Sequence, residues 1–152
     1  MMKLRETVDA AKSALEREPA VREDRVAEVR SRLGNDLGRN PAAHALIARR
    51  GTAAVGVATC FVGYSTFLAR PLLNIHDIAV IPKARGRGIG TALLEEITAL
   101  GRRLACCKIT LEVREDNRPA RTLYAAEGFS PAWLDGREIR YLFLEKLLNR
   151  DE

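Results

Sequence analysis

A short basic stretch rich in glycine is the part of the chain whose residue types most directly suggest chemistry. Arginine supplies charge-assisted hydrogen bonds to phosphate oxygens, and glycine, which has no Cβ atom, lets a ligand approach the backbone closely. The cations and glycines alternate without an acidic residue among them: Lys83, Arg85, Gly86, Arg87, Gly88 and Gly90. The pattern predicts an anion site that suits a pyrophosphate, the alternative being a glycine-rich connection whose arginines are merely solvated.

The flanking elements decide what the backbone of this stretch can do. β-Branched residues at 78, 80 and 81, closed by Pro82, predict a strand. Downstream, apolar residues share one helical face: Leu93, Ile97, Leu100 and Leu104. The first N–H groups of a helix have no internal partner, and the helix dipole adds partial positive charge there. A glycine-rich turn that connects a strand to the start of a helix therefore favours a bound anion.

The spacing of the glycines separates this stretch from two common phosphate-binding motifs. A dinucleotide fingerprint would need its third glycine where Thr91 stands, and a P-loop would need Gly-Lys-Ser/Thr, which the chain lacks. The stretch instead resembles the coenzyme A signature of the GNAT superfamily of N-acetyltransferases. That signature is Arg/Gln-x-x-Gly-x-Gly/Ala, and Arg85, Gly88 and Gly90 match it.

A second stretch, residues 117–129, reads as a capped helix. Asn117 is a good N-cap, Pro119 is tolerated in the first turn, and Gly128 fits the position just past the end. The stretch resembles the second GNAT signature, Asn-x-x-Ala-x-x-Leu-Tyr-x-x-x-Gly-Phe. It matches at every defined position: Asn117, Ala120, Leu123, Tyr124, Gly128 and Phe129. Two signatures in the right order around one strand–helix–strand unit favour membership of the superfamily.

The resemblance implies a fold and a coenzyme. It implies one α/β domain over residues 1–152, with the GNAT fold: a mixed central sheet of about six to seven strands and helices on both faces. The sheet would splay between the strands at 72–81 and 108–113, which a helical crossover makes parallel. The pantetheine arm of acetyl-CoA would lie in that gap against Ile78, Ala79 and Val80. Backbone N–H groups would hold the pyrophosphate at Arg85, Gly86, Arg87, Gly88, Ile89, Gly90 and Thr91. Asn117 and Tyr124 would touch the coenzyme near its pantetheine.

The implied reaction is direct transfer of the acetyl group to an amine, without a metal. Tyr124 stands where many members of the family keep their general acid, the alternative being a tyrosine that only packs on its helix face. His76 is a candidate base, because imidazole titrates near ~6.5, but an ordinary strand histidine weighs equally. Strand alternation sends His76 to the face of Ile78 and Val80, and Asp77 to the opposite face.

The region around His76 resembles one branch of the family more than others. Residues 64–67 followed by His76-Asp77 are similar to the diamine (polyamine and thialysine) acetyltransferases. That branch has Glu-Asp at the aligned pair, with the glutamate as base. Histidine in place of the glutamate removes one carboxylate, which weakens the expectation of a polycationic acceptor. The acceptor is therefore expected to be a primary amine of a small molecule or a protein.

Composition narrows the class of protein further. A net charge of +5 over 152 residues suits an anionic ligand, and neither an RNA-binding aromatic pattern nor a zinc-finger spacing is present. Three cysteines, two of them adjacent (Cys106 and Cys107), predict a reducing, cytoplasmic location and core packing rather than catalysis. The uncharged run at 51–69 is too polar for a membrane span, and no signal peptide is expected.

Further elements follow from local patterns. The sequence predicts helices at 3–17 and 22–33, a loop at 34–41, and strands at 45–48 and 53–62. GNAT domains usually open with a strand, and the sequence pattern does not indicate one before residue 3, which leaves open whether this chain has that strand. A hairpin of residues 130–134 and 138–147 would turn at Asp135-Gly136, and its long second strand could serve a homodimer. A coenzyme A-binding regulator without activity is the alternative to an enzyme, although Tyr124 and both signatures favour the enzyme.

Overall fold

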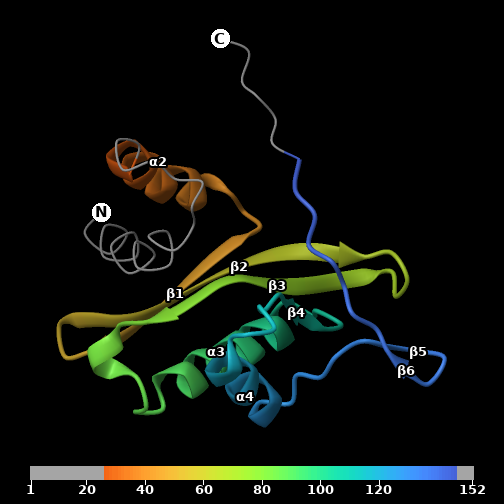
Figure 1. The fold of residues 1–152 in the computed structure, drawn as a ribbon. Coiled ribbons are helices and arrows are strands. Elements are labelled where there is room, and N and C mark those ends of the chain that lie inside the picture. Colours follow the sequence, from red (N-terminus) through yellow and green to blue (C-terminus); the bar gives the residue numbers. More distant parts are fainter. Residues whose placement is uncertain (1–25, 147–152) are drawn as a thin grey trace.

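The computed structural model describes residues 26–146 of the 152-residue chain. Figure 1 shows the order of its elements. They are α2 (Val26–Arg39), β1 (Ala43–Arg50), β2 (Ala53–Ser65), β3 (Arg70–Val80), the short 3-10 helix η2 (Pro82–Ala84), α3 (Ile89–Arg103), β4 (Ile109–Leu111), α4 (Arg118–Ala126), β5 (Trp133–Leu134) and β6 (Arg137–Glu138). The helix predicted at 3–17 lies outside the described residues.

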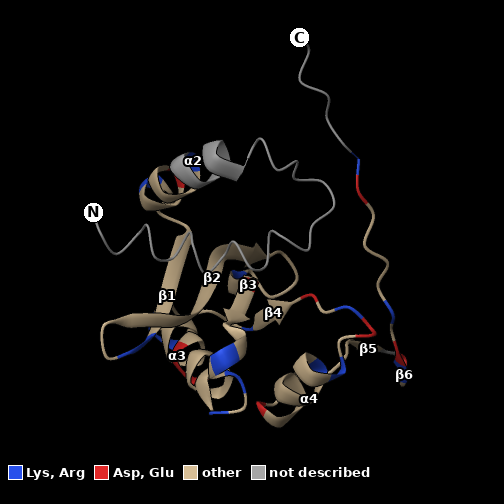
Figure 2. Cartoon of the chain, turned by 60° about the vertical axis from the view of Figure 1, so that its left-hand side comes forward, with Lys and Arg blue, Asp and Glu red and all other residues tan. Residues whose placement is uncertain are grey.

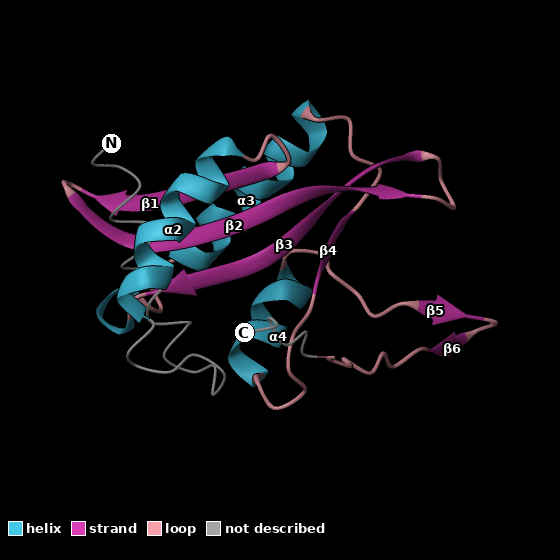
Figure 3. Cartoon of the chain, turned by 90° about the horizontal axis from the view of Figure 1, so that it is seen from above, coloured by secondary structure: helices cyan, strands magenta, loops and turns pink. Residues whose placement is uncertain are grey.

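A mixed four-stranded sheet in the order β1-β2-β3-β4 forms the centre of the molecule. β1, β2 and β3 are antiparallel neighbours, whereas β3 and β4 run parallel, with α3 as the crossover between them. α2 lies on one face of the sheet, and α3 and α4 lie on the other (Figures 1 and 3). The predicted α/β architecture, parallel strand pair and two helical layers are confirmed. Among residues 26–146 this sheet has four strands rather than six or seven, because β5 and β6 pair separately.

The hydrophobic core lies between the sheet and α3. Its buried members come from β2, β3, α3 and α4: Ala58, Cys60, Leu73, Ile75, Leu93, Leu94, Ile97 and Tyr124. The predicted inward face of α3 is confirmed, since Leu93 and Ile97 are buried and Leu100 and Leu104 pack against the cluster. Burial of each large aliphatic side chain contributes about 1.5–3 kcal/mol, so this face holds α3 firmly under β3.

Several elements differ in extent from the sequence-based expectation, and β1 and β2 run beyond the strands predicted at 45–48 and 53–62. α2 continues through Gly34 to Arg39, so most of the loop predicted at 34–41 is helical. Gly34 is buried within the helix, and an ion pair joins Arg32 to Asp36 one turn later, at 3.9 Å. β4 is shorter than predicted, because it covers Ile109–Leu111 rather than 108–113. Tertiary packing overrides the weak helix propensity of glycine and asparagine in α2.

The C-terminal hairpin is also shorter than expected. Its turn is confirmed, because Asp135 and Gly136 both take positive φ angles, of 50° and 75°, as the type I′ two-residue hairpin turn requires. Its strands, however, have two residues each, and no strand follows Glu138 up to residue 146. The long second strand is therefore not found in the described part of the chain. Within that same part, none of the helices combines the length and apolar character that a membrane crossing needs.

Candidate functional site

The glycine-rich stretch forms the connection between β3 and α3. After β3 the chain makes η2, then a turn in which Gly86 and Gly88 adopt φ angles of 69° and 75°. Gly88 is the N-cap of α3, and its carbonyl accepts the bond from the Ala92 N–H at 2.9 Å. The three N–H groups that precede Ala92 in the helix therefore lie at its open end. The predicted strand–turn–helix junction is confirmed, with basic residues along the turn (Figure 2).

Arg85 fastens this turn to the end of the strand. Its Nε donates to the Val80 carbonyl at 3.0 Å, and its backbone N–H donates to the Pro82 carbonyl at 3.3 Å. The Arg85 N–H, which the sequence predicted as part of the pyrophosphate cradle, is thus directed into the turn. A guanidinium carries five N–H donors, and the bond to Val80 takes one of them. The side chain therefore shapes the turn while keeping donor capacity for an anion.

Gly90 has a role that the sequence analysis missed. A Cβ atom placed on it would lie 2.8 Å from Leu123 Cδ2 of α4. The glycine therefore lets the start of α3 approach α4 closely. By contrast, a Cβ on Gly86 or Gly88 would point into open space, where their positive φ angles are the constraint. Through Gly90, the first signature packs against Leu123 of the second signature. Gly88 leaves open space beside the N-terminal end of α3.

The sheet opens next to this junction. β3 and β4 pair only as Leu73 with Ile109, Asn74 with Thr110 and Ile75 with Leu111. β3 then continues to Val80 after β4 has ended, so residues 78–80 lie beyond the last rung that the two strands share. Pairing between these two parallel strands ends at this point, within the region where the sequence analysis expects them to diverge. An unpaired strand edge offers backbone N–H and C=O groups to another extended chain.

A β-bulge at His76 changes which face its side chain occupies. On β2, Thr59 pairs with Asp77 and Cys60 with Ile75, which leaves His76 between them without a partner. The core-facing residues shift from Leu73 and Ile75 before the bulge to Ile78 and Val80 after it.

His76 therefore does not share the face of Ile78 and Val80, and the expectation from strict alternation is wrong. Its exposed ring meets the Phe61 ring edge-on, with centroids 5.6 Å apart, on the α2 side of the sheet. Asp77 faces that side too, as predicted, because it pairs with Thr59 between two core-facing residues. An extra residue in one strand shifts the alternation by one, which brings His76 and Asp77 to the same face.

Residues of the second signature build and cap α4. The Asn117 side chain accepts a hydrogen bond from the Ala120 N–H at 3.4 Å, so its predicted capping role is confirmed. Gly128 takes a φ of 85° just past the helix end, where glycine is favoured. These caps set where α4, the helix that carries Tyr124, begins and ends.

Tyr124 is the buried polar group of this site. Its side chain is 9% exposed within the core, and its ring packs edge-on against Phe129 at a centroid distance of 5.9 Å. No hydrogen bond joins its hydroxyl to another of the described residues. Burial raises the pKa of Tyr124 above that of an ordinary tyrosine. The phenol therefore keeps its proton at neutral pH and is available as a donor.

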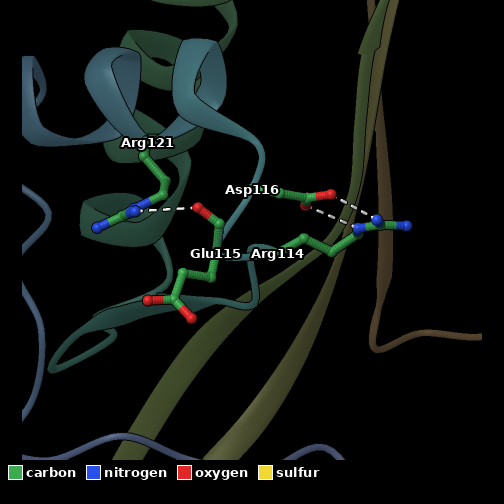
Figure 4. A network of polar contacts seen from close by, with 4 residues as sticks. All are labelled: Arg114, Glu115, Asp116 and Arg121. Carbon is green, nitrogen blue, oxygen red and sulfur yellow. Dashed lines mark hydrogen bonds and ion pairs between the residues drawn. The ribbon is translucent and has the colours of Figure 1, made fainter.

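The loop that leads from β4 to α4 is held by a polar network (Figure 4). Arg114 binds both carboxylate oxygens of Asp116, at 3.0 and 2.6 Å, and Arg121 of α4 donates to the Glu115 carbonyl at 3.0 Å. The hydrogen bond from Arg114 lowers the pKa of Asp116. The network orders the residues immediately before Asn117. Sequence reasoning missed it, because charged residues in a loop follow no period.

Cys60 and Cys106 are not activated nucleophiles. Burial, and then the nearby Asp77 carboxylate, raise the pKa of Cys60 to about 11. Burial, and then Cys107, raise the pKa of Cys106, which packs against the core as predicted. A reactive cysteine needs a lowered pKa, so these thiols do not fit a covalent acyl carrier. In residues 26–146, His, Cys, Asp and Glu side chains do not gather in threes as a metal site would need.

Comparison with known proteins places this arrangement in a family. Residues 7–129 match the model described as the acetyltransferase (GNAT) family. The chain belongs to that family. It is 31% identical over 114 residues to thialysine N-epsilon-acetyltransferase of Mus musculus, a match covering 66% of each chain. The resemblance to the GNAT superfamily and to its thialysine branch is thus confirmed.

Other GNAT relatives differ in their acceptors. N-alpha-acetyltransferase RimI of Mycobacterium tuberculosis is 37% identical over 103 residues, a match covering 66% of this chain and 61% of that protein. Aminoglycoside acetyltransferase AAC(6')-Iy, solved with a bisubstrate analogue, superposes with a TM-score of 0.75 at 19% identity, covering 97% of this chain and 93% of that one. That likeness confirms the fold.

Proposed function

We propose that this GNAT protein is an acetyl-CoA-dependent N-acetyltransferase that acts on a primary amine of a small molecule or a protein. One observation carries the proposal. The open, basic end of α3 lies beside the point where β3 outruns β4, and the buried Tyr124 hydroxyl comes from the neighbouring α4. The names of the relatives support the chemistry, because they include a thialysine N-epsilon-acetyltransferase and an N-alpha-acetyltransferase.

The proposed coenzyme site follows the residues of the two signatures. The N–H groups from Gly86 to Thr91 face the pyrophosphate, while Arg85 and Arg87 supply positive charge. Along the edge of β3 that faces away from β2, backbone groups of Ile78 and Val80 pair with the pantetheine arm much as an added strand would, with Ala79 between them and Arg85 Nε sharing the Val80 carbonyl. Acetyl-CoA supplies the activated thioester when bound. The chain's own residues bind it, orient it and move protons.

Two proton movements complete the proposed reaction. An alkyl ammonium must lose a proton before its nitrogen can attack, and His76, next to Asp77 on the α2 face, accepts it directly or through water. The departing coenzyme sulfur needs a proton, which the Tyr124 phenol donates. The raised pKa values of Cys60 and Cys106 support direct transfer to the amine rather than passage through an acyl-cysteine.

Location and assembly are finer parts of the proposal. Cysteines that are all unpaired support a reducing, cytoplasmic compartment. The exposed apolar side chains at Tyr141, Leu142, Phe143 and Leu144 support pairing with a second copy of the chain, although the structure shows no long strand there up to residue 146, where the described residues end.

Calorimetric titration with acetyl-CoA, followed by thiol-release assays on an amine panel, tests the activity. The panel should contain thialysine, a short peptide with a free N-terminus and an aminoglycoside, one for each kind of acceptor. We expect saturable binding and amine-dependent release of free coenzyme A. Binding without transfer to any amine would favour the inactive regulator, and no binding would overturn the assignment.

The cap of α3 gives a second test with a matched control. Gly88→Ala places a methyl group where the anion is proposed to lie, so we expect the Kd for acetyl-CoA to rise about tenfold, the order of one lost charge-assisted hydrogen bond. Gly51→Ala imposes similar strain, because Gly51 has a φ of 59° and equally open surroundings in the β1–β2 turn. Each variant should lose about 1–2 kcal/mol of unfolding free energy by denaturant titration. Equal affinities in the two variants would contradict the proposed pyrophosphate site.

A further inference from the structure

Asn74 is an unusual residue at its position in the sheet. It lies in β3 between Leu73 and Ile75, both buried, although asparagine is disfavoured in strands. Its half-buried amide Nδ2 lies 3.1 Å from Thr110 Oγ1 and 3.5 Å from the Thr110 carbonyl oxygen. A carbonyl only accepts, so the amide nitrogen must be the atom that faces Thr110. The side chain therefore bonds β3 to β4 in addition to the backbone ladder.

This bond lies where the two strands are about to part. Asn74 and Thr110 form the middle of the three β3–β4 pairs, one residue before the last. The bulge at His76 follows directly on β3. Parallel pairing is slightly weaker per residue than antiparallel pairing, and a ladder this short has few backbone bonds. A side-chain bond at its middle rung therefore adds substantially to what holds β4 in place.

We propose that Asn74 is a positioning residue for acetyl transfer. By holding Thr110, it fixes the rung after which β3 and β4 separate, and so fixes the width of the gap at Ile78–Val80. The inference rests on the proposed function, in which that gap receives the pantetheine arm. Asn74 pairs with Phe61 of β2, and the Phe61 ring contacts the His76 ring. The hydrogen bond from Asn74 to Thr110 therefore also stabilises the bulge at His76, on the α2 side of the sheet.

A double-mutant cycle tests this role. Asn74→Leu keeps the size of the side chain and removes the amide, and Thr110→Val removes the hydroxyl. We expect each to raise the Kd for acetyl-CoA several-fold, with the double variant no worse than Asn74→Leu alone, since both changes break one interaction. Thr110→Ser keeps the hydroxyl and should bind within twofold of the parent. Additive losses, or a loss in Thr110→Ser equal to that in Thr110→Val, would overturn the proposal.

Two further readouts separate positioning from general stability. ADP carries the pyrophosphate without the arm, so its competition constant should be unchanged in Asn74→Leu. Thr98→Val is the matched control, because the Thr98 hydroxyl donates to the Leu94 carbonyl at 2.8 Å within α3, away from the gap. It should lower the Tm like Thr110→Val but leave the acetyl-CoA Kd unchanged. Equal weakening of ADP and acetyl-CoA would overturn the inference, whereas a parent protein that binds neither would refute the proposed function instead.

Discussion

Replacing Tyr124 with phenylalanine should lower the turnover number about 100-fold while leaving the Kd for acetyl-CoA within about twofold. General acid catalysis contributes on the order of 10²–10⁴ in rate, and the substitution removes only the hydroxyl. The ring packs in the core and against Phe129, and phenylalanine keeps those contacts. Steady-state kinetics at saturating amine, with calorimetric titration of acetyl-CoA, measures both quantities.

The control for this substitution is Tyr141→Phe. Tyr141 is 78% exposed, so the loss of its hydroxyl should change neither turnover nor affinity. Because burial raises the pKa of Tyr124, its proton should stay in place from neutral into mildly alkaline pH. The ratio of parent to variant rates should therefore hold over that range. Unchanged turnover in Tyr124→Phe would remove the residue from the mechanism.

The junction between β3 and α3 was predictable because its signals are local. Pro82 ends the strand, Gly86 and Gly88 allow the positive φ angles of the turn, and apolar residues on one face indicate α3. The caps of α4 follow equally from Asn117 and Gly128. Each of these features depends on residues within a few positions of one another, so spacing alone indicates it.

The bulge at His76 depends instead on a partner strand. The pairing of β2 on both sides of Thr59 decides which residue of β3 is left without a partner. The sequence of β3 alone does not indicate that a residue is left over, or which one. The end of β4 at Leu111 and the short β5–β6 pair are likewise set by what lies beside them. A strand pattern shows that a segment can pair and does not show what it pairs with. The local site was therefore predictable in its parts, but the face that His76 occupies was not.

The position of His76 on the α2 side of the sheet leads to a second prediction with a large expected effect. An alkyl amine with a pKa of about 10.4 is neutral only about once in a few thousand molecules at pH 7, so a base is most valuable at low pH. His76→Ala should lower kcat/KM for the amine about 100-fold at pH 7. The deficit should shrink as the pH rises toward 10, because the amine then loses its proton unaided.

His44→Ala is the matched control, since His44 is the other histidine of the chain and lies on β1 opposite Cys60 rather than at the bulge. Its pH–rate profile should follow that of the parent. The exposure of His76, its place one residue past the last β3–β4 pair and its edge-on contact with Phe61 put the imidazole on the α2 side, where an amine can reach it from solvent. If His76→Ala keeps the parent's acidic limb, the proton must leave by another route. Asp77 faces the same side of the sheet and is then the next residue to replace. Asp77→Asn removes its carboxylate, the other candidate proton acceptor beside His76, and keeps the shape of the side chain.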